Sequence, residues 1–390
     1  MVVQPCAMED VEMKAQFWSD KRVLITGHTG FKGSWLSLWL KQRGAQVAGY
    51  ALPPASGENL FELASVENGI VDSTYADIRN LDSLSEVVRR FRPEIIFHLA
   101  AQPIVRVSYV EPVETFQTNV MGTLNLLEAV RRTPCCRAMV MITSDKCYEN
   151  HEWLWPYRED DALGGYDPYS SSKGCAELVI SAYRRSFFGP ERPGRIAIAS
   201  ARAGNVIGGG DFAKDRLVPD AMRAMLRGHT LKVRSPDAIR PWQHVLEPLA
   251  GYLLLAERLW ESPSQYAESW NFGPSQDDTR SVRWMLERLK GLLGESFSWE
   301  ADSEPTPHEA HLLTLDSAKA RGRLGWQPRW TLDTTLQAIA AWFETYKAGK
   351  SVRHLTIQQI ERYESEGARE TSHHLEHHLP DHSRNHAGSP

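Results

Sequence analysis

The side chains best suited to chemistry lie in two short segments of this 390-residue chain. Residues 144–146 supply a hydroxyl, a carboxylate and an amine, one residue after the apolar run 139–142. Such a run is typical of a buried parallel strand, whose end lies at the edge where open α/β sheets bind ligands. Tyr169 and Lys173 follow four residues apart, which places both on one face of a helix. We predict that the two segments share one pocket.

Tyr169 and Lys173 are suited to act as a redox base. A nearby ammonium lowers the pKa of a phenol, and the positive charge of an oxidised nicotinamide would lower it further. The phenolate then removes a hydroxyl proton while hydride leaves the same carbon. A pair on a surface helix is the alternative interpretation, but a glycine fingerprint upstream favours the redox base.

Asp145 and Lys146 add a second acid and a second base. An enzyme that only oxidises or epimerises an alcohol does not need them, whereas elimination of water from a sugar needs both. Lys146 must be neutral to act as a base, and burial beside Lys173 and a nicotinamide would lower its pKa. The alternative is a structural Asp145–Lys146 ion pair at the strand end.

A glycine fingerprint, Gly27-x-x-Gly30-x-x-Gly33, links a predicted strand to a predicted helix. In this context the loop lets the backbone approach a pyrophosphate at the helix N-terminus, so we expect a dinucleotide site. Residues 50–52, after the second strand, include neither the acid typical of NAD sites nor an Arg, and Lys32 could reach a 2′-phosphate. Asp77 and Ile78, after the third strand, fit contacts to adenine, with Asp77 as a helix N-cap as the alternative.

Apolar strands alternate with amphipathic helices in the first half of the chain. Strands are predicted at 22–26, 45–52, 70–76, 94–100, 137–144 and 195–201, and helices at 34–43, 81–91, 114–132 and 170–188. This pattern predicts an α/β fold of the Rossmann type, with a doubly wound parallel sheet covered on both faces. We expect this domain to span 17–204 plus parts of 240–275.

The second half reads as a smaller C-terminal α/β substrate-binding lobe, discontinuous within 205–350, with helices at 217–228, 246–260, 281–293 and 332–347. Residues 365–390 are polar and His-rich, and we expect a disordered tail. Metal chelation by the His cluster at 373–378 is the alternative, and no metal is predicted elsewhere.

Composition excludes several classes of function. The formal net charge is -5 and basic residues are scattered, which argues against a nucleic-acid partner. The five cysteines lack CxxC spacing and are expected to be reduced thiols. No apolar stretch approaches the ~20 residues of a membrane span, so we expect a soluble cytoplasmic protein with no membrane partner.

Three motifs together carry a family resemblance. Residues 27–35 (GHTGFKGSW), 98–103 (HLAAQP) and 143–150 (TSDKCYEN) resemble the nucleotide-sugar 4,6-dehydratases among the extended short-chain dehydrogenase/reductases. The similarity covers roughly residues 17–350. Members that act on dTDP-glucose carry Thr-Asp-Glu where this chain has Ser144, Asp145 and Lys146. That departure disfavours the dTDP-glucose and GDP-mannose groups and agrees with the CDP-glucose 4,6-dehydratase subgroup.

The resemblance implies a reaction cycle on one bound NAD. Tyr169 would take the proton of the glucose 4-hydroxyl as hydride passes from C4 to NAD. Lys146 would remove the C5 proton while Asp145 protonates the departing 6-hydroxyl, and hydride would return to C6. The product would be CDP-4-keto-6-deoxy-D-glucose, a precursor of deoxy sugars of bacterial surface polysaccharide such as lipopolysaccharide O-antigen. A homodimer or tetramer, paired through helices 114–132 and 170–188, is also implied.

The predicted site residues fall into three sets. The catalytic set is Ser144, Asp145, Lys146, Tyr169 and Lys173. The cofactor set is Gly27, His28, Thr29, Gly30, Phe31, Lys32, Gly33, Asp77, Ile78, Leu99, Ala100, Ala101, Gln102, Asn119, Thr143, Tyr169 and Lys173. The substrate set is Arg106, Ser144, Asn205, Leu217, Val218, Arg234, Arg240 and His244. Arg202 is a further candidate for the diphosphate, with a surface salt bridge as its alternative.

Two other functions remain open. Another nucleotide-sugar 4,6-dehydratase, a 4-epimerase or a decarboxylase would share the fold, the glycine loop and the Tyr169/Lys173 pair, but the last two do not need Asp145 and Lys146. From a different class, the chain could be a catalytically silent NAD(H)-binding scaffold, which the retention of every expected catalytic side chain disfavours.

Overall fold

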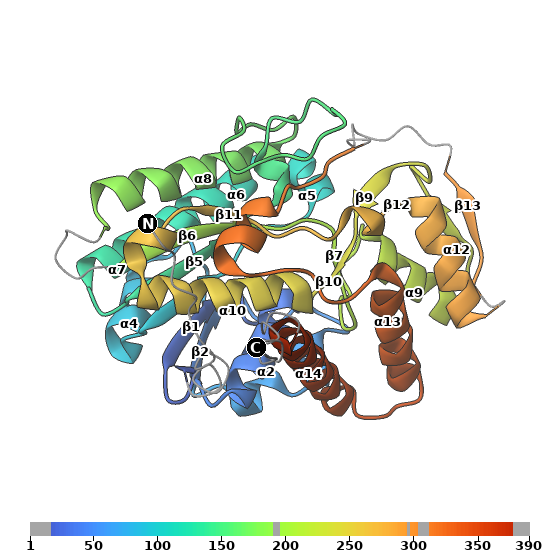
Figure 1. Cartoon of the computed structure of the whole chain (residues 1–390), viewed down its shortest axis with the longest axis horizontal. Helices are drawn as coiled ribbons and strands as arrows, with labels where there is room; N and C mark the ends of the chain where they lie inside the picture. The colour runs from blue at the N-terminus through green and yellow to red at the C-terminus, as the bar shows by residue number, and fades with distance from the viewer. Residues whose placement is uncertain (1–16, 190–195, 295–296, 303–311, 377–390) are drawn as a thin grey trace, which may run out of the picture.

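The computed structural model describes residues 17–376 apart from 190–195, 295–296 and 303–311. Its larger lobe is built on a seven-stranded parallel sheet of order β11-β6-β5-β4-β1-β2-β3 (Figure 1). The strands are β1 (Arg22–Thr26), β2 (Gln46–Ala51), β3 (Asp72–Tyr75), β4 (Ile95–His98), β5 (Ala138–Ile142), β6 (Ala197–Arg202) and β11 (Ser269–Asn271). Because strand order reverses between β1 and β4, the predicted Rossmann-type doubly wound sheet is confirmed.

Helices cover both faces of this sheet, and the strand residues alternate between two cores. Val23 and Ile25 of β1 pack in the core that includes α2 and α10, whereas Leu24 packs in the core that includes α4, α7 and α8. These helices are α2 (Phe31–Gln42), α4 (Leu81–Phe91), α7 (Gly122–Arg132), α8 (Pro168–Ser186) and α10 (Leu246–Glu261). Helices on both faces therefore hold the strands whose carboxyl ends form one edge of the sheet.

One predicted helix is interrupted. Residues 114–132 do not form a single α-helix; α5 (Val105–Val110) and α6 (Pro112–Phe116) come first, and a π-helical turn at Gln117–Met121 precedes α7. The short helix α3 (Leu60–Leu63) lies between β2 and β3. Turns of the π type frequently mark functional positions, and this one carries Asn119.

In its described residues, the smaller lobe combines three helices with short strand pairs. Its helices are α9 (Leu217–Arg227), α12 (Val282–Leu293) and α13 (Leu332–Lys347). Its strand pairs are β7 (Val206–Ile207) with β10 (Gln243–His244), β8 (Leu231–Val233) with β13 (Trp299–Ala301), and β9 (Ile239–Pro241) with β12 (Thr279–Ser281). The helix α11 (Pro263–Tyr266) leads from α10 into β11, so the chain returns to the large sheet after entering the small lobe.

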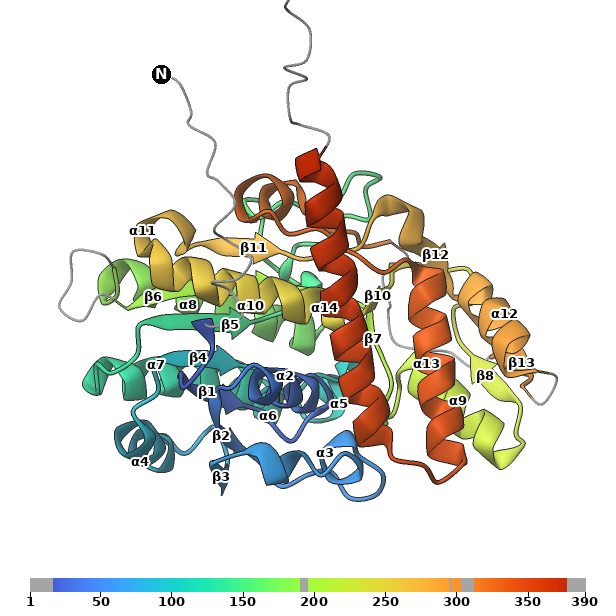
Figure 2. The ribbon, with the colours of Figure 1, turned by 60° about the horizontal axis from the view of Figure 1, so that its bottom comes forward.

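The prediction of a disordered tail from residue 365 is wrong over its first part. Helix α14 (Val352–Glu376) continues through this region and packs against α2 and α13 (Figure 2). Carboxylates bind it to distant indoles, with Trp39 Nε1 2.6 Å from Glu364 and Trp330 Nε1 2.6 Å from Glu366. Bonds between residues so far apart in the sequence cannot be predicted from a local pattern, which is why this helix was missed. Residues 377–390 and part of the His cluster at 373–378 lie outside the described residues.

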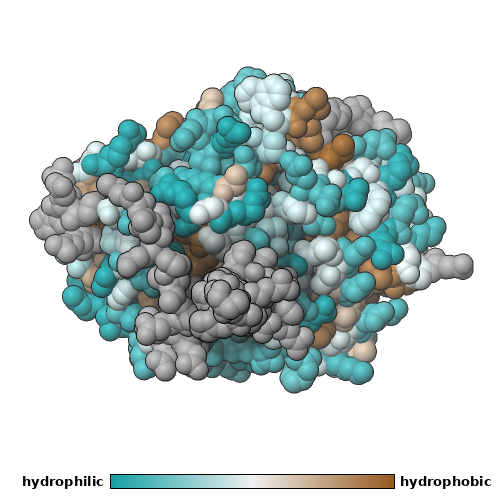
Figure 3. Space-filling model, viewed as in Figure 1, coloured by the Kyte–Doolittle hydropathy of each residue, from teal (hydrophilic) through white to brown (hydrophobic). Residues whose placement is uncertain are grey.

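The face in Figure 3 is mostly hydrophilic, and its hydrophobic residues are scattered in small groups. Within the described part of the chain, no helix is both long and apolar enough to cross a membrane.

Candidate active site

A cavity of about 440 Å³ lies between the two lobes, where β5 and β6 end. The large lobe contributes Ser144, Asp145, Lys146 and Tyr169 to its wall. The small lobe contributes, among others, Asn205, Arg216, Leu217, Val218, Arg234 and Arg240. Four of the five predicted catalytic residues therefore line one cavity of a size typical of small-molecule sites.

The turn after β5 sets the positions of the predicted acid and base. Ser144 caps a single 3₁₀ turn, Asp145–Cys147, by accepting a hydrogen bond from the backbone N–H of Lys146 at 3.2 Å. Its hydroxyl also donates to Oδ1 of Asp145 at 3.0 Å. Asp145 is buried, and Nδ2 of Asn205 lies 3.5 Å from its Oδ2. Among the described residues, this carboxylate hydrogen-bonds to Ser144 and Asn205 and not to Lys146, so the alternative of a structural ion pair loses its support.

Helix α8 holds Tyr169 and Lys173 in its first two turns. Asp167 caps the helix by accepting from Ser170 N at 2.9 Å, and both Tyr169 and Lys173 are buried. Burial raises the pKa of Tyr169 to about 12, with the Ser144 hydroxyl opposing the shift. Burial lowers the pKa of Lys173 to about 8. Burial, Asp145 and Asp167 together outweigh Ser144 and Arg216, so the phenol pKa is raised in the protein without NAD. The lowering of this pKa by Lys173 and a bound nicotinamide stays a prediction.

Behind the cavity lies a buried ion pair. Arg202 Nη2 is 2.8 Å from Glu177 Oε2, and its Nη1 donates to Tyr148 Oη at 2.7 Å. Thr143 donates its hydroxyl to Glu177 at 2.5 Å. Arg202 is therefore neither the predicted diphosphate ligand nor the alternative surface salt bridge. The structure also argues against the predicted role of Thr143 in cofactor binding, because its hydroxyl already donates a hydrogen bond to Glu177.

The glycine loop has the close backbone packing that a dinucleotide site requires. Gly27 adopts φ +78°, and a Cβ there would lie 2.7 Å from Ala100 N. A Cβ on Gly33 would overlap the backbone of Gly27 and lie 2.7 Å from His28 Cα. The loop then enters the N-terminus of α2 with Gly30 as its N-cap. These observations fit a pyrophosphate against exposed backbone N–H groups.

Two loop side chains lie elsewhere than predicted. His28 is buried against Gly49, with Nε2 2.9 Å from Ser73 Oγ, so its ring is part of the packing between the loop and the sheet. Burial lowers its pKa to about 4, which keeps it neutral. Lys32 lines the cavity beside Asp145, so the expectation that it reaches a 2′-phosphate after β2 is wrong. Burial lowers the pKa of Lys32 to about 8.

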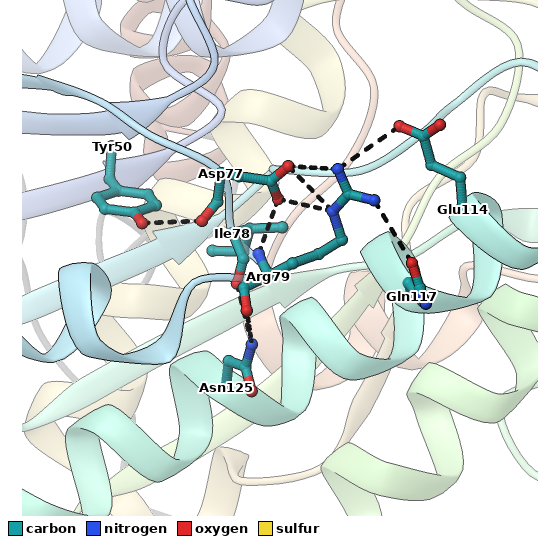
Figure 4. Close-up of polar contacts among 7 residues, drawn as sticks. All are labelled: Tyr50, Asp77, Ile78, Arg79, Glu114, Gln117 and Asn125. Atoms are coloured by element: carbon teal, nitrogen blue, oxygen red, sulfur yellow. Dashed lines mark hydrogen bonds and ion pairs between the residues drawn. The ribbon is translucent and has the colours of Figure 1, made fainter.

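The end of the sheet at β2 and β3 is arranged around Arg79 (Figure 4). Asp77 accepts from Arg79 N at 2.8 Å and pairs with its guanidinium at 2.6 Å. The alternative role of Asp77 as a helix N-cap is wrong, because Asn80 caps α4. Ile78 is buried, and the Tyr50 hydroxyl donates to the Asp77 carbonyl at 2.9 Å. Contact of Asp77 and Ile78 with adenine stays a prediction, and Asp77 would share its carboxylate with Arg79.

The segment after β4 runs along the same edge of the sheet and holds the predicted cofactor residues Leu99, Ala100, Ala101 and Gln102. Asn119 fixes it in place, accepting from Gln102 N at 2.9 Å and donating to Ser172 Oγ at 2.9 Å. Because Asn119 is buried and both ends of its amide are occupied, its side chain positions the loop instead of facing a ligand.

The predicted substrate residues divide in a similar way. Asn205, Leu217, Val218, Arg234 and Arg240 line the cavity, and so does Arg106, which pairs with Asp215 at 2.9 Å. The prediction that His244 binds substrate is wrong. His244 is fully buried, packs against Trp35 and Trp330, and does not line the cavity. Burial lowers its pKa to about 3, consistent with a neutral core residue.

Sequence reasoning missed Arg216. This guanidinium lines the cavity, pairs with Asp211 at 2.9 Å and is close enough to Tyr169 and Lys32 to influence their pKa values. Its position in the sequence could have indicated this role, because it follows the glycine run 208–210 and directly precedes Leu217, a predicted substrate residue.

Comparison with known proteins agrees with this geometry. Residues 24–339 match the family model described as GDP-mannose 4,6 dehydratase. The chain is 51% identical over 352 residues to a CDP-glucose 4,6-dehydratase of Salmonella typhimurium, covering 90% of this chain and 98% of that protein.

Solved structures of low sequence identity share the fold. A UDP-glucose 4-epimerase of Thermotoga maritima aligns with a TM-score of 0.72 at 23% identity, over 84% of this chain and 99% of that one. A dTDP-glucose 4,6-dehydratase of Bacillus anthracis, solved with NAD, aligns with a TM-score of 0.70 at 22% identity, over 85% and 99%. The family match over residues 24–339 and the 51% identity to the Salmonella enzyme show that the chain belongs to the GDP-mannose 4,6 dehydratase family of extended short-chain dehydrogenase/reductases.

Proposed function

We propose that this protein is an NAD-dependent CDP-glucose 4,6-dehydratase, a hydro-lyase that forms CDP-4-keto-6-deoxy-D-glucose. The observation that carries the proposal is the cavity wall, where Asp145 and Lys146 join the redox base Tyr169. The similarity to the Salmonella enzyme over almost its full length supports the choice of CDP-glucose.

In the proposed reaction Tyr169 takes the proton of the 4-hydroxyl while the C4 hydrogen leaves as hydride. NAD would be held at the glycine loop, where it would supply the hydride acceptor for C4 and the hydride donor for C6. Lys146 removes the C5 proton, which the 4-ketone has made acidic, and Asp145 gives its proton to O6 as the C6–O6 bond breaks. A proton returned to C5 completes the product, so one water is lost and no net oxidation occurs.

The charges around the cavity suit a nucleoside diphosphate. Lys32, Arg216, Arg234 and Arg240 all line it. Guanidinium groups bind diphosphates through paired, charge-assisted hydrogen bonds, which would orient the sugar toward Tyr169. NAD would also bring positive charge close to the phenol and so lower a pKa that burial, as the largest cause, raises to about 12.

The proposal is tested by offering the purified protein NAD with CDP-glucose, dTDP-glucose, UDP-glucose and GDP-mannose separately. We expect the alkali-sensitive absorbance of a keto-deoxy sugar, and fastest turnover with CDP-glucose. Faster turnover of another nucleotide sugar would move the protein to a neighbouring dehydratase group. A product epimeric at C4, without loss of water, would instead make it an epimerase.

We also propose a homo-oligomer that acts in the cytoplasm, where it would supply deoxysugars for surface polysaccharide. Apolar side chains on the exposed side of the α5–α8 region support self-association: Val110, Val113, Met121, Leu178 and Phe187 are all exposed. Leu178→Glu on α8 should shift the sedimentation of the protein toward that of a monomer. Wild-type protein that sediments as a 44.1 kDa monomer would contradict the oligomer.

A further inference from the structure

Gly204 occupies the loop between β6 and β7, directly against the carboxyl group of Asp145. A Cβ built at this position would overlap Oδ2 and Cγ of Asp145 and lie 2.6 Å from Oδ1. Gly204 does not have a positive φ, so its backbone conformation does not explain the glycine. The missing side chain instead creates the space that the carboxyl group fills. We infer that Gly204 and Asn205 form a seat that aims Asp145 during elimination, an inference that rests on the proposed function.

Asn205 supplies the other side of this seat. It lies in the left-handed region, with φ +48°, a conformation that asparagine adopts more readily than most non-glycine residues. In this conformation its Nδ2 lies 3.5 Å from Oδ2 of Asp145, while Ser144 Oγ holds Oδ1 at 3.0 Å. Both carboxyl oxygens thus have a polar neighbour, and the flat face of Gly204 limits rotation of the group between them.

Gln243 fixes the seat from behind. Its buried side-chain Nε2 donates to the Gly204 carbonyl at 3.1 Å and to the Phe272 carbonyl at 2.9 Å. Its backbone N–H donates to the Asn205 carbonyl at 3.3 Å, next to the β7–β10 pairing. The position of the acid is therefore set by loop, strand and side chain together, and these bonds from Gln243 to the loop use no atom of Asp145.

This arrangement predicts which half of the reaction depends on Gly204. Oxidation at C4 uses Tyr169 on α8, which the seat does not include. Elimination needs the Asp145 proton directed at O6, and a misplacement of about 1 Å can cost roughly 10²-fold in rate. Gly204 and Asn205 are positioning residues in this account, and they act through Asp145.

The test is a double-mutant cycle with Gly204→Ala, Asp145→Ala and the double variant. With CDP-glucose and NAD, Gly204→Ala should make product about 10²-fold more slowly, accumulate enzyme-bound NADH and keep the KM for CDP-glucose within about twofold. In the Asp145→Ala background the same change should have no further effect on rate or melting temperature, because the overlap is gone. Gly291→Ala is the matched control, since a Cβ at that position meets no atom within 4 Å.

The outcomes separate the two proposals. If wild-type protein forms no keto-deoxy sugar from any nucleotide sugar, the proposed function fails. If wild type is active and Gly204→Ala matches it, or if Gly204→Ala lowers the rate equally with and without Asp145, the seat is wrong. Should Gly204→Ala alone fold poorly, recovery of the melting temperature in the double variant still supports the overlap with Asp145, and no recovery overturns it.

Discussion

The redox residues and the elimination residues share a cavity but are positioned by different means. Tyr169 and Lys173 lie on α8, a helix of 19 residues with an Asp167 cap, so helical geometry fixes their spacing. Asp145 and Lys146 lie on a single 3₁₀ turn. Asp145 is held by contacts to Ser144, Gly204 and Asn205, two of which are about 60 residues away in sequence.

This difference shows how one fold can host several reactions. A helical redox pair is robust, because local hydrogen bonds define it even when the loops around it change. An acid on a short turn is only as well placed as the loops that face it. We therefore expect changes in the seat to separate elimination from oxidation, and changes in α8 to stop both.

The largest effect is expected from Tyr169→Phe. Loss of this base should slow the first hydride transfer by ~10²–10⁴-fold and remove all later steps with it. The measurement is absorbance of reduced nicotinamide after mixing enzyme, NAD and CDP-glucose, where neither NADH nor product should appear at the native rate. A variant that reduced its cofactor at near-native rate would exclude Tyr169 as the base.

Lys146→Met should stop the elimination of water but leave the oxidation at C4 intact. Oxidation at C4 needs Tyr169, so hydride should still leave the sugar, but the C5 proton would have no base and NADH should persist on the enzyme. Product formation should fall by ~10²–10⁴-fold, and exchange of the C5 proton with deuterated solvent should stop. Formation of the 6-deoxy product at the wild-type rate would assign the base to another group.

The same contrast explains what the sequence could and could not predict. Apolar strands and the glycine loop follow local rules, and so does the Tyr169–Lys173 spacing, which is why the sheet and the redox pair were predictable. The neighbours of Asp145 depend on how β6, β7 and β10 assemble, and no local pattern encodes that assembly. Arg202 was misassigned for the same reason, because its partner Glu177 comes from α8.

The third prediction concerns the buried ion pair between Glu177 and Arg202. This pair connects the redox residues on α8 with the segment that carries the elimination residues. Glu177 accepts from Thr143, just before the elimination residues, and lies one turn beyond Lys173 on α8. Burial alone would raise its pKa, but Arg202 and the hydroxyl donors bring it below the ordinary value, so the pair is ionised.

Glu177→Gln should lower the free energy of unfolding by ~3–5 kcal/mol, because Arg202 keeps a buried charge without its partner. Denaturant unfolding measures this loss, and NADH formation and product formation should fall together. Glu261→Gln is the control, since its pair with Arg258 is on the surface and is worth ~0–1 kcal/mol. Equal stability losses in the two variants would contradict a special role for the buried pair.

The smallest expected effect is a change in the pH dependence of stability when His98, the last residue of β4, is replaced. Thr123 donates its hydroxyl to the Asn119 carbonyl at 2.7 Å, so it must accept from His98 Nε2 at 3.0 Å. Nδ1 of His98 then accepts from Thr26 Oγ1 at 2.7 Å, which requires the neutral ring. Burial, followed by the charge of Lys173, lowers the pKa of His98 to about 3.

The sign of the pH effect follows from this assignment. The unfolded chain binds a proton at His98 below a pKa of ~6.5, whereas the folded chain does not until about pH 3, so acid favours unfolding between these values. One such group changes the free energy of unfolding by up to ~1.4 kcal/mol per pH unit. His98→Asn should therefore reduce the slope of stability against pH from 6 to 4, measured by urea unfolding, by at most that amount. An unchanged slope would mean that His98 is protonated in the folded protein, and the proposed bond from Thr26 to a neutral ring would then be wrong.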